Sequence, residues 1–100
     1  MNIQIQSIHF SPSEALNKQI SRKVQKYFGK YPFIKGSKVF LKLQENEPEL
    51  KQIMEVRLKV PHGELFAKTK DNNFYNALDK NINKLRKQLE KYKQKVYAKP

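Results

Sequence analysis

The sequence predicts an α+β fold: a β-α-β-β-β-α two-layer sandwich in which a four-stranded, largely antiparallel sheet carries two helices on one face. Four segments alternate apolar and polar residues with a period of two, which is typical of half-buried strands. Two longer segments repeat apolar residues every three or four positions, which is typical of amphipathic helices. Because each element has one apolar face, covering one sheet face with both helices buries all of them. One hundred residues suit a single domain, residues 1–100.

The four strands are expected where residues of one parity are apolar. The first, over residues 2–9, alternates until Ser7-Ile8, where the pattern slips and a bulge or the end of the strand is expected. An acidic, polar connector over residues 44–52 precedes the third strand, and Pro61-His62-Gly63-Glu64 predicts a tight turn before the fourth. The last three strands are expected at residues 38–43, 53–60 and 65–70, with Val39, Leu41, Leu43, Met54, Val56, Leu58, Val60, Leu65, Ala67 and Thr69 facing inward.

The first helix is expected from Pro12 to Phe28. Ser11 is a suitable N-cap, Pro12 suits the first helical position, and Glu14 stands three residues after the cap, where its side chain can reach back to it. Gly29 is expected to end the helix. The inner face is expected to contain Leu16, Ile20, Val24 and Tyr27.

The last helix is expected from Asn72 to Val96, and it is the longest element. Asp71, Asn72 and Asn73 are each suitable N-caps. At 100° per residue the apolar positions fall within one narrow arc, so we expect them to form a seam that packs on the sheet. These positions are Phe74, Leu78, Ile82, Leu85, Leu89, Tyr92 and Val96.

The composition predicts a polyanionic partner. Lysine and arginine outnumber aspartate and glutamate by 21 to 9, which gives a net charge of +12. Nucleic acid is the first expectation, followed by an anionic membrane or an acidic protein, and the plain alternative is a lysine-rich, hydrated surface. The absence of cysteine excludes disulfides and thiol chemistry. Without a signal peptide or a long apolar window, the expected location is the cytoplasm, with no membrane partner.

The sequence contains no pattern that indicates an enzyme, a cofactor or a metal site. Gly29, Gly36 and Gly63 are scattered singly, so they do not form a phosphate-binding loop. The acidic residues of the connector have no neighbouring histidine and are expected to be hydrated, which does not favour acid–base catalysis. We therefore expect no catalytic residues, no cofactor and no metal.

The outer faces of the two helices are the candidate RNA-binding surface. Lysines at helical spacing lie about 5–6 Å apart and repel one another, a cost that a phosphate-rich partner reverses. If the helices lie side by side, they form one cationic plateau. RNA is favoured over DNA because lysine, which contacts phosphates, far outnumbers arginine and no helix-turn-helix is indicated. The candidates are Lys18, Arg22, Lys23 and Lys26 in the first helix and Lys80, Lys84, Arg86, Lys87, Lys91 and Lys95 in the last.

The opposite face of the sheet has two interpretations. It is either a surface that stacks bases or a hydrated face with two exposed aromatic rings, and the pattern alone favours the hydrated face. Its outward residues are expected to include Lys38, Phe40, Lys42, Arg57, Lys59, Phe66 and Lys68.

The last helix contains two motifs that carry a family resemblance: Phe74-Tyr75-Asn76-Ala77-Leu78-Asp79 and Lys84-Leu85-Arg86-Lys87-Gln88-Leu89-Glu90-Lys91-Tyr92-Lys93. Together with Ser13-Glu14-Ala15-Leu16 in the first helix, they resemble the bacterial hibernation-promoting factors and ribosome-associated inhibitors. The resemblance covers essentially the whole chain. The positions that match the family's basic residues are Lys23, Lys26, Lys84, Lys87 and Lys91, with Lys87 standing where the family has arginine.

This resemblance implies a non-enzymatic factor that binds the small ribosomal subunit in stationary or starved cells. It would occupy the mRNA channel and the tRNA sites and contact the subunit's rRNA with its basic helices, with ribosomal proteins as further contacts. Long family members carry an added domain that dimerises ribosomes, so this chain resembles a short form, expected to be a monomer off the ribosome.

Two other hypotheses use the same cationic residues. One is a regulatory protein-binding domain whose basic face meets an acidic partner. The other is a peripheral membrane binder, which is disfavoured because the apolar stripe of the last helix is already committed to the core. Sedimentation with ribosomes distinguishes the ribosome-binding hypothesis from these two alternatives.

Overall fold

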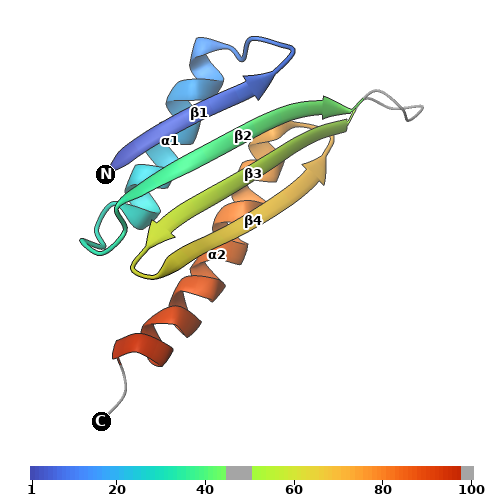
Figure 1. The fold of residues 1–100 in the computed structure, drawn as a ribbon. Coiled ribbons are helices and arrows are strands. Elements are labelled where there is room, and N and C mark those ends of the chain that lie inside the picture. Colours follow the sequence, from blue (N-terminus) through green and yellow to red (C-terminus); the bar gives the residue numbers. More distant parts are fainter. Residues whose placement is uncertain (45–50, 98–100) are drawn as a thin grey trace.

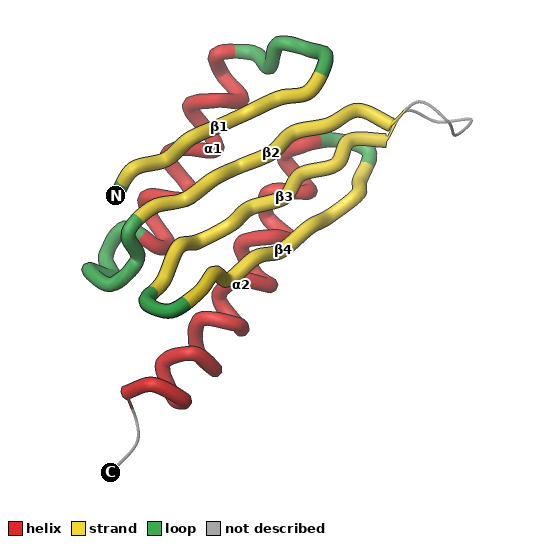
Figure 2. The backbone as a smooth tube through the Cα atoms, viewed as in Figure 1, coloured by secondary structure: helices red, strands yellow, loops and turns green. Residues whose placement is uncertain are grey.

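The sheet contains all four expected strands, with both helices on one of its faces (Figures 1 and 2). The structure, a computed structural model, describes residues 1–44 and 51–97. The strand order is β1-β2-β3-β4; β1 pairs with β2 in parallel, and the other two pairings are antiparallel. The predicted α+β fold is confirmed. The elements are β1 (Asn2–Ile8), α1 (Glu14–Phe28), β2 (Gly36–Gln44), β3 (Lys51–Val60), β4 (Gly63–Asp71) and α2 (Phe74–Tyr97).

The connections explain the mixture of strand directions. Helix α1 follows β1 and precedes β2 in the chain. A helical crossover of this kind joins neighbouring strands that run parallel. Pro61-His62 alone joins β3 to β4, because Gly63 already belongs to β4, so the turn is shorter than predicted. His62 has a φ of 68° and supplies the left-handed residue of this turn. Most of the predicted acidic connector, residues 45–50, lies outside the described residues.

Strand β1 ends where the sequence pattern slips. Ile8 is its last residue and is 45 % exposed, and His9 has a φ of 63°, which turns the chain out of the sheet. Phe10 then folds back, and its ring stacks on Phe74 with a centroid distance of 5.6 Å. The expected end of the strand is confirmed, and the apolar residue beyond it packs against the first turn of α2.

The start of α1 differs from the prediction. Ser13, not Ser11, is the N-cap, and its Oγ accepts a hydrogen bond of 3.0 Å from the backbone N–H of Leu16. The helix therefore begins at Glu14, and Pro12 precedes the cap. Both serines are chemically competent caps, and Ser13 is the one whose extended backbone, with ψ of 154°, leads directly into the first turn. The predicted capping box between Ser11 and Glu14 is wrong.

The other helix ends follow the predicted residues more closely. Gly29 ends α1 as expected, and its N–H donates to the carbonyl of Gln25 at 2.9 Å. Of the three candidate caps for α2, Asn73 takes the position, because its Oδ1 accepts from the N–H of Asn76 at 2.8 Å. Helix α2 begins at Phe74, two residues after the predicted start.

The apolar faces of both helices meet the sheet in one core. Leu16, Ile20 and Val24 of α1 are buried as predicted, but Tyr27 is only half-buried and Phe28 is fully buried instead. On α2, Phe74, Leu78, Ile82, Leu85 and Leu89 are at most 6 % exposed. Val96 is 47 % exposed, which corrects its place in the seam, because α2 runs past the end of the sheet (Figure 1).

A buried polar residue fixes how α2 is rotated on the sheet. Asn81 is fully buried. Its Nδ2 donates to the carbonyl of Met54 in β3 at 2.8 Å, and its Oδ1 accepts from Thr69 Oγ1 in β4 at 2.6 Å. Because an unsatisfied amide in this position costs about 1–3 kcal/mol, other rotations of α2 are disfavoured.

Replacing Leu85 by aspartate should unfold the domain. Leu85 is fully buried, and the variant places an unpaired carboxylate in the core, at a cost comparable with the net stability of a small domain. Val96→Asp is the matched control, because it changes the same stripe of α2 at a 47 % exposed position and should leave the fold intact. Thermal unfolding measured by circular dichroism tests both. A cooperative transition of Leu85→Asp near the parent temperature would contradict the seam.

Candidate nucleic-acid interface

A groove between α1 and α2 collects basic and aromatic side chains. It has a volume of about 670 Å³. Four cationic side chains line it against one carboxylate, that of Glu90. Phosphates can be held by such cations, and the two tyrosines present faces that can stack a base. The lining residues are Lys26, Tyr27, Lys30 and Tyr31 from α1 and the loop after it, and Asn83, Arg86, Lys87, Leu89 and Glu90 from α2.

The two tyrosine rings hold the cations of the groove in place. Lys26 Nζ lies 5.4 Å and the Arg86 guanidinium 5.3 Å from the centre of the Tyr27 ring. Lys30 Nζ lies 5.5 Å and Lys93 Nζ 5.3 Å from the centre of the Tyr31 ring. Cations within about 6 Å of a ring are attracted to it. Each tyrosine therefore brings together one cation from the α1 segment and one from α2.

The helices also meet through an ion pair that the sequence did not suggest. Lys23 of α1 and Asp79 of α2 are joined by a hydrogen-bonded ion pair, and the Lys23 side chain is 29 % exposed. An exposed pair of this kind contributes about 0–1 kcal/mol. The pair confirms that α1 and α2 lie side by side, and it occupies one of the predicted candidate cations.

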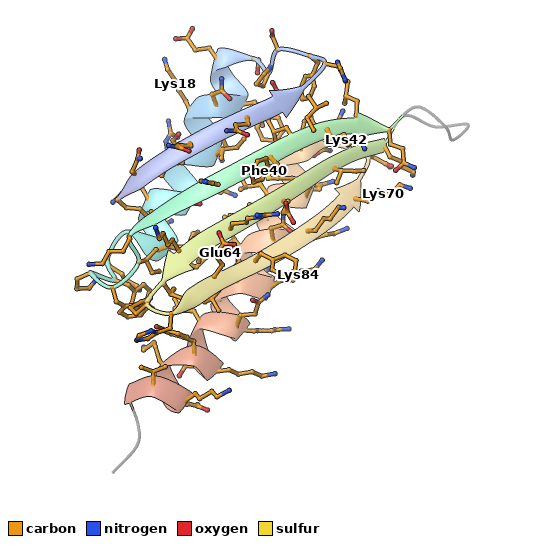
Figure 3. All side chains as sticks on the ribbon, in the orientation of Figure 1. Lys18, Phe40, Lys42, Glu64, Lys70 and Lys84 are labelled. Carbon is orange, nitrogen blue, oxygen red and sulfur yellow. The ribbon has the colours of Figure 1, made fainter. Side chains whose placement is uncertain are left out.

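Two more candidate lysines of α2 face β4 and not α1. Lys84 Nζ donates to the carbonyl of Lys68 and to Thr69 Oγ1, both at 2.9 Å, and Figure 3 shows it beside this edge strand. Lys80 Nζ bonds to Asp71 Oδ2 at 2.5 Å. Gln88 Nε2 continues the row, donating to the carbonyl of Phe66 at 2.7 Å. The predicted plateau is therefore not continuous, because Lys80 and Lys84 point to the side of α2 opposite α1.

The spacing of helix and strand explains this row. Residues 80, 84 and 88 recur every four positions, which is about 6 Å along a helix. The β4 residues that they contact recur about every two positions, which is roughly 6.6 Å along a strand. The two spacings are therefore similar, and successive donors of α2 meet successive acceptors of β4. Strand β4 is an edge of the sheet, so some of its carbonyls lack a strand partner. The side chains of α2 supply donors to them.

The remaining candidates are exposed to solvent. Lys18 lies 3.9 Å from Glu14, but both side chains are more than 70 % exposed, so the contact is weak. Arg22 and Lys26 follow Lys18 on the outer face of α1 at four-residue spacing. The exposed candidates on α2 are Arg86 and Lys87, which line the groove, and Lys91 and Lys95 beyond it.

The fold changes the acidity of Asp71. A hydrogen bond from Lys80 lowers the pKa of the Asp71 carboxyl below 3.8, its ordinary value, and the N–H of Asn72 adds a second donor. The carboxylate stays charged and holds the start of α2 against the end of β4. It is a structural feature beside the basic surface.

Sequence reasoning missed Tyr27, Tyr31, Lys30 and Lys93 as site residues. It places Tyr27 inside the core and assigns no role to Lys30 and Tyr31. The available signal was the Lys-Tyr pair at 26–27, which recurs four residues later at 30–31. Basic residues interleaved with aromatic ones at helical spacing indicate a surface where both types are exposed together.

Residues 3–97 match the model of the family described as "Sigma 54 modulation protein / S30EA ribosomal protein". The chain belongs to the S30EA family. It is 27 % identical over 95 residues to a ribosome hibernation promoting factor of Pseudomonas putida, covering 95 % of this chain and 89 % of that one.

Solved structures share the S30EA fold seen here. A ribosomal subunit interface protein from Coxiella burnetii superposes with a TM-score of 0.82 at 24 % identity, covering 93 % of this chain and 98 % of that one. The N-terminal domain of Thermus thermophilus Protein Y gives a TM-score of 0.77 at 20 % identity, with coverages of 92 % and 99 %. The family of hibernation factors is non-enzymatic. Within residues 1–44 and 51–97, no three metal-binding side chains come together, and neither helix is apolar enough to cross a membrane.

Charge reversal should affect the melting temperature differently at Lys84 and at Lys87, although the sequence predicts the same role for both. Lys84→Glu removes two hydrogen bonds to β4 and places a carboxylate beside the Lys68 carbonyl, so the melting temperature should fall. Lys87→Glu is the matched control, because Lys87 is exposed in the groove, and its melting temperature should stay close to that of the parent. Equal melting temperatures for the two variants would show that Lys84 has no structural role.

The contribution of Asp71 to stability should disappear in acid. Because its pKa is lowered in the folded protein, the stabilisation is present above the ordinary value of 3.8 and is lost as the pH falls through the folded pKa. Asp71→Asn should therefore melt below the parent at neutral pH, and the two curves should converge at lower pH. Melting temperatures across this range test the expectation. A difference that does not change with pH would mean that the charge of Asp71 is not involved.

Proposed function

We propose that this S30EA protein is a ribosome hibernation factor and a single ribosome-binding domain. It binds the small ribosomal subunit and its rRNA through the helix layer, occupies the mRNA channel and the tRNA sites, and inhibits translation in stationary or starved cells. The observation that carries the proposal is the groove between α1 and α2, where Lys26 and Arg86 lie against the half-buried Tyr27 ring and Lys87 lines the same groove. The family membership and the name of the P. putida relative support the ribosome as the partner.

The surface is suited to phosphates and not to base edges. Its cations are mostly lysines, which act as point charges, whereas reading a base edge usually requires paired donors such as those of arginine. Arg86 is held against Tyr27, so its guanidinium is positioned by the protein before RNA arrives. Recognition of structured rRNA by shape and backbone fits this arrangement. Arg22, Lys26, Arg86, Lys87 and Lys91 are the central contacts in the proposal, with Lys18, Lys23, Lys80, Lys84 and Lys95 around them.

Reversing two groove charges should abolish subunit binding without unfolding the domain. The double variant Lys26→Glu/Lys87→Glu is expected to bind purified small subunits at least about ten-fold more weakly. Its affinity should also depend less on salt, with the log–log slope reduced by about two, because two phosphate contacts are lost. The matched control is Lys26→Arg/Lys87→Arg, which keeps both charges and should bind like the parent. Binding is measured by co-sedimentation over a range of salt concentrations.

Two results would contradict the proposal. One is a double Glu variant that binds subunits as tightly as the parent while keeping the parent's melting temperature. The other is absence of the native protein from the ribosomal fractions of starved cells on a density gradient. Binding of the parent that does not change up to about 0.3 M salt would also count against phosphate contacts.

A further inference from the structure

None of the helices and strands that the structure describes covers the face of the sheet opposite α1 and α2 (Figure 3). The strand register places its side chains in rows that cross the sheet. Phe40 lies near the middle of this face, with Lys42 and Lys70 toward one end and Glu64 toward the other (Figure 3). The two central rows are Gln4, Lys38, Arg57 and Phe66, and Gln6, Phe40, Glu55 and Lys68.

Among the described residues of this open face, cations outnumber carboxylates, and the two carboxylates share one partner. Glu55 Oε2 lies 3.3 Å from the Arg57 guanidinium, and Glu64 Oε1 lies 3.9 Å from it. The carboxylates of Glu55 and Glu64 are therefore both paired with the Arg57 guanidinium. In the part of the chain that the structure describes, four lysines of the face form no ion pair: Lys38, Lys42, Lys59 and Lys68.

Two aromatic rings lie among these cations. Phe66 on β4 is 56 % exposed and is paired in register with Arg57. The Arg57 guanidinium lies 5.2 Å from the centre of the Phe40 ring, so Phe40 is partly covered and Phe66 is the ring that faces solvent. An exposed phenyl ring contributes little to folding, but every nucleobase has a face that can stack on it.

A hollow at one end of the open face brings cations together, and Phe66 adjoins it through its register partner Arg57 without lining it. Its volume is about 590 Å³. Gly36 stands in the row between Asn2 and Lys59 and has no side chain to fill the space. Arg57, directly across from Phe66, also lines the hollow. The charged lining residues are the cations Lys35, Lys38, Arg57 and Lys59 and one carboxylate, that of Glu64.

We propose that the open face of the sheet is a second RNA-binding surface, which takes a single-stranded segment. One base stacks on Phe66, and the adjoining phosphates lie in the hollow against Lys38 and Lys59. A double helix does not fit this role, because its bases are already stacked on one another and are not available to the ring. The inference rests on the proposed function for the class of partner, RNA, and adds a second contact on the opposite side of the domain.

The shape of the molecule allows both surfaces to act together. The backbone extends over 52 × 24 × 19 Å, so the domain is elongated, with the groove in its helix layer and the open face on the other side of the sheet. A strand on the open face and structured RNA on the helix layer are held on opposite sides and do not compete for the same residues. Binding at one surface therefore leaves the other accessible.

The direct test is a tryptophan in place of Phe66. The chain has no tryptophan, so Phe66→Trp gives a fluorescence signal that comes from this position alone. Adding a short oligouridylate should quench it, because the base stacks on the indole. Replacing Lys38 and Lys59 by glutamine in the same protein should weaken the quenching, whereas Lys26→Glu/Lys87→Glu should leave it in place. No quenching by an oligouridylate that is bound, as shown by its own fluorescence anisotropy, would overturn the inference.

Truncation of the ring gives the matching affinity measurement. Phe66→Ala should bind the oligouridylate about five-fold or more weakly, the effect expected for one stacked aromatic ring. Tyr75→Ala is the control, because Tyr75 is a 46 % exposed ring on α2, outside the open face, and its loss should change nothing. Equal affinities for Phe66→Ala and the parent would overturn the inference. So would quenching of the Phe66→Trp variant by polyglutamate but not by RNA, which would assign the face to an acidic protein.

The two proposals fail in different ways. If Phe66→Ala and the Lys38 and Lys59 variants bind small subunits and the oligouridylate like the parent, while the groove variant loses subunits, the open-face inference fails and the proposed function stands. If the groove variant keeps subunit binding, the proposed function fails whatever the fluorescence of Phe66→Trp does. Quenching of that fluorescence together with loss of subunits in the groove variant supports both.

Discussion

The rotation of α2 about its own axis is the constraint on which the rest of the structure depends. Three sets of contacts hold it: the apolar seam against the sheet, the buried amide of Asn81 between β3 and β4, and the donors of Lys84 and Gln88 on the edge of β4. A turn of the helix by one residue would move every side chain by about 100°. It would bury a lysine and leave Asn81 without partners. The same setting directs Arg86 and Lys87 into the groove.

The structure also shows how a chain with a net charge of +12 accommodates the repulsion between its cationic side chains. Net charge of this size opposes the compact state. Few carboxylates are available. Lys26, Lys30, Arg86 and Lys93 lie on the rings of Tyr27 and Tyr31, and Lys84 donates to a backbone carbonyl. Rings and carbonyls orient a cation without cancelling its charge. The field of the surface is therefore largely retained. Among the ten candidates, the described residues place a carboxylate close to Lys23 and Lys80, and one at 3.9 Å from Lys18.

Periodicity predicted the fold, because burial of alternating or helical faces leaves a direct trace in the sequence. It predicted the candidate site less well. The direction of Lys80 and Lys84 depends on which side of α2 meets β4, and that is decided by Asn81, a residue that looks like an ordinary surface position. The predicted N-cap of α1 is Ser11 and the observed one is Ser13, because two chemically equivalent serines stand two residues apart. Val96 fits the apolar stripe, but α2 extends beyond the end of the sheet. The sequence of the helix does not indicate where the sheet beneath it ends.

The uneven distribution of carboxylates leaves the domain with two cationic surfaces. On the helix layer, Asp79 and Asp71 are used to join elements: the first connects α1 with α2, and the second connects α2 with β4. On the open face, Glu55 and Glu64 are both taken by Arg57. In each layer these acids join elements or neighbouring strands and leave lysines near aromatic rings, which are half-buried in the groove and exposed at Phe66. A protein that needed only solubility would gain nothing from placing its few acids in this way, whereas one that contacts RNA on both sides keeps each surface cationic and correctly shaped.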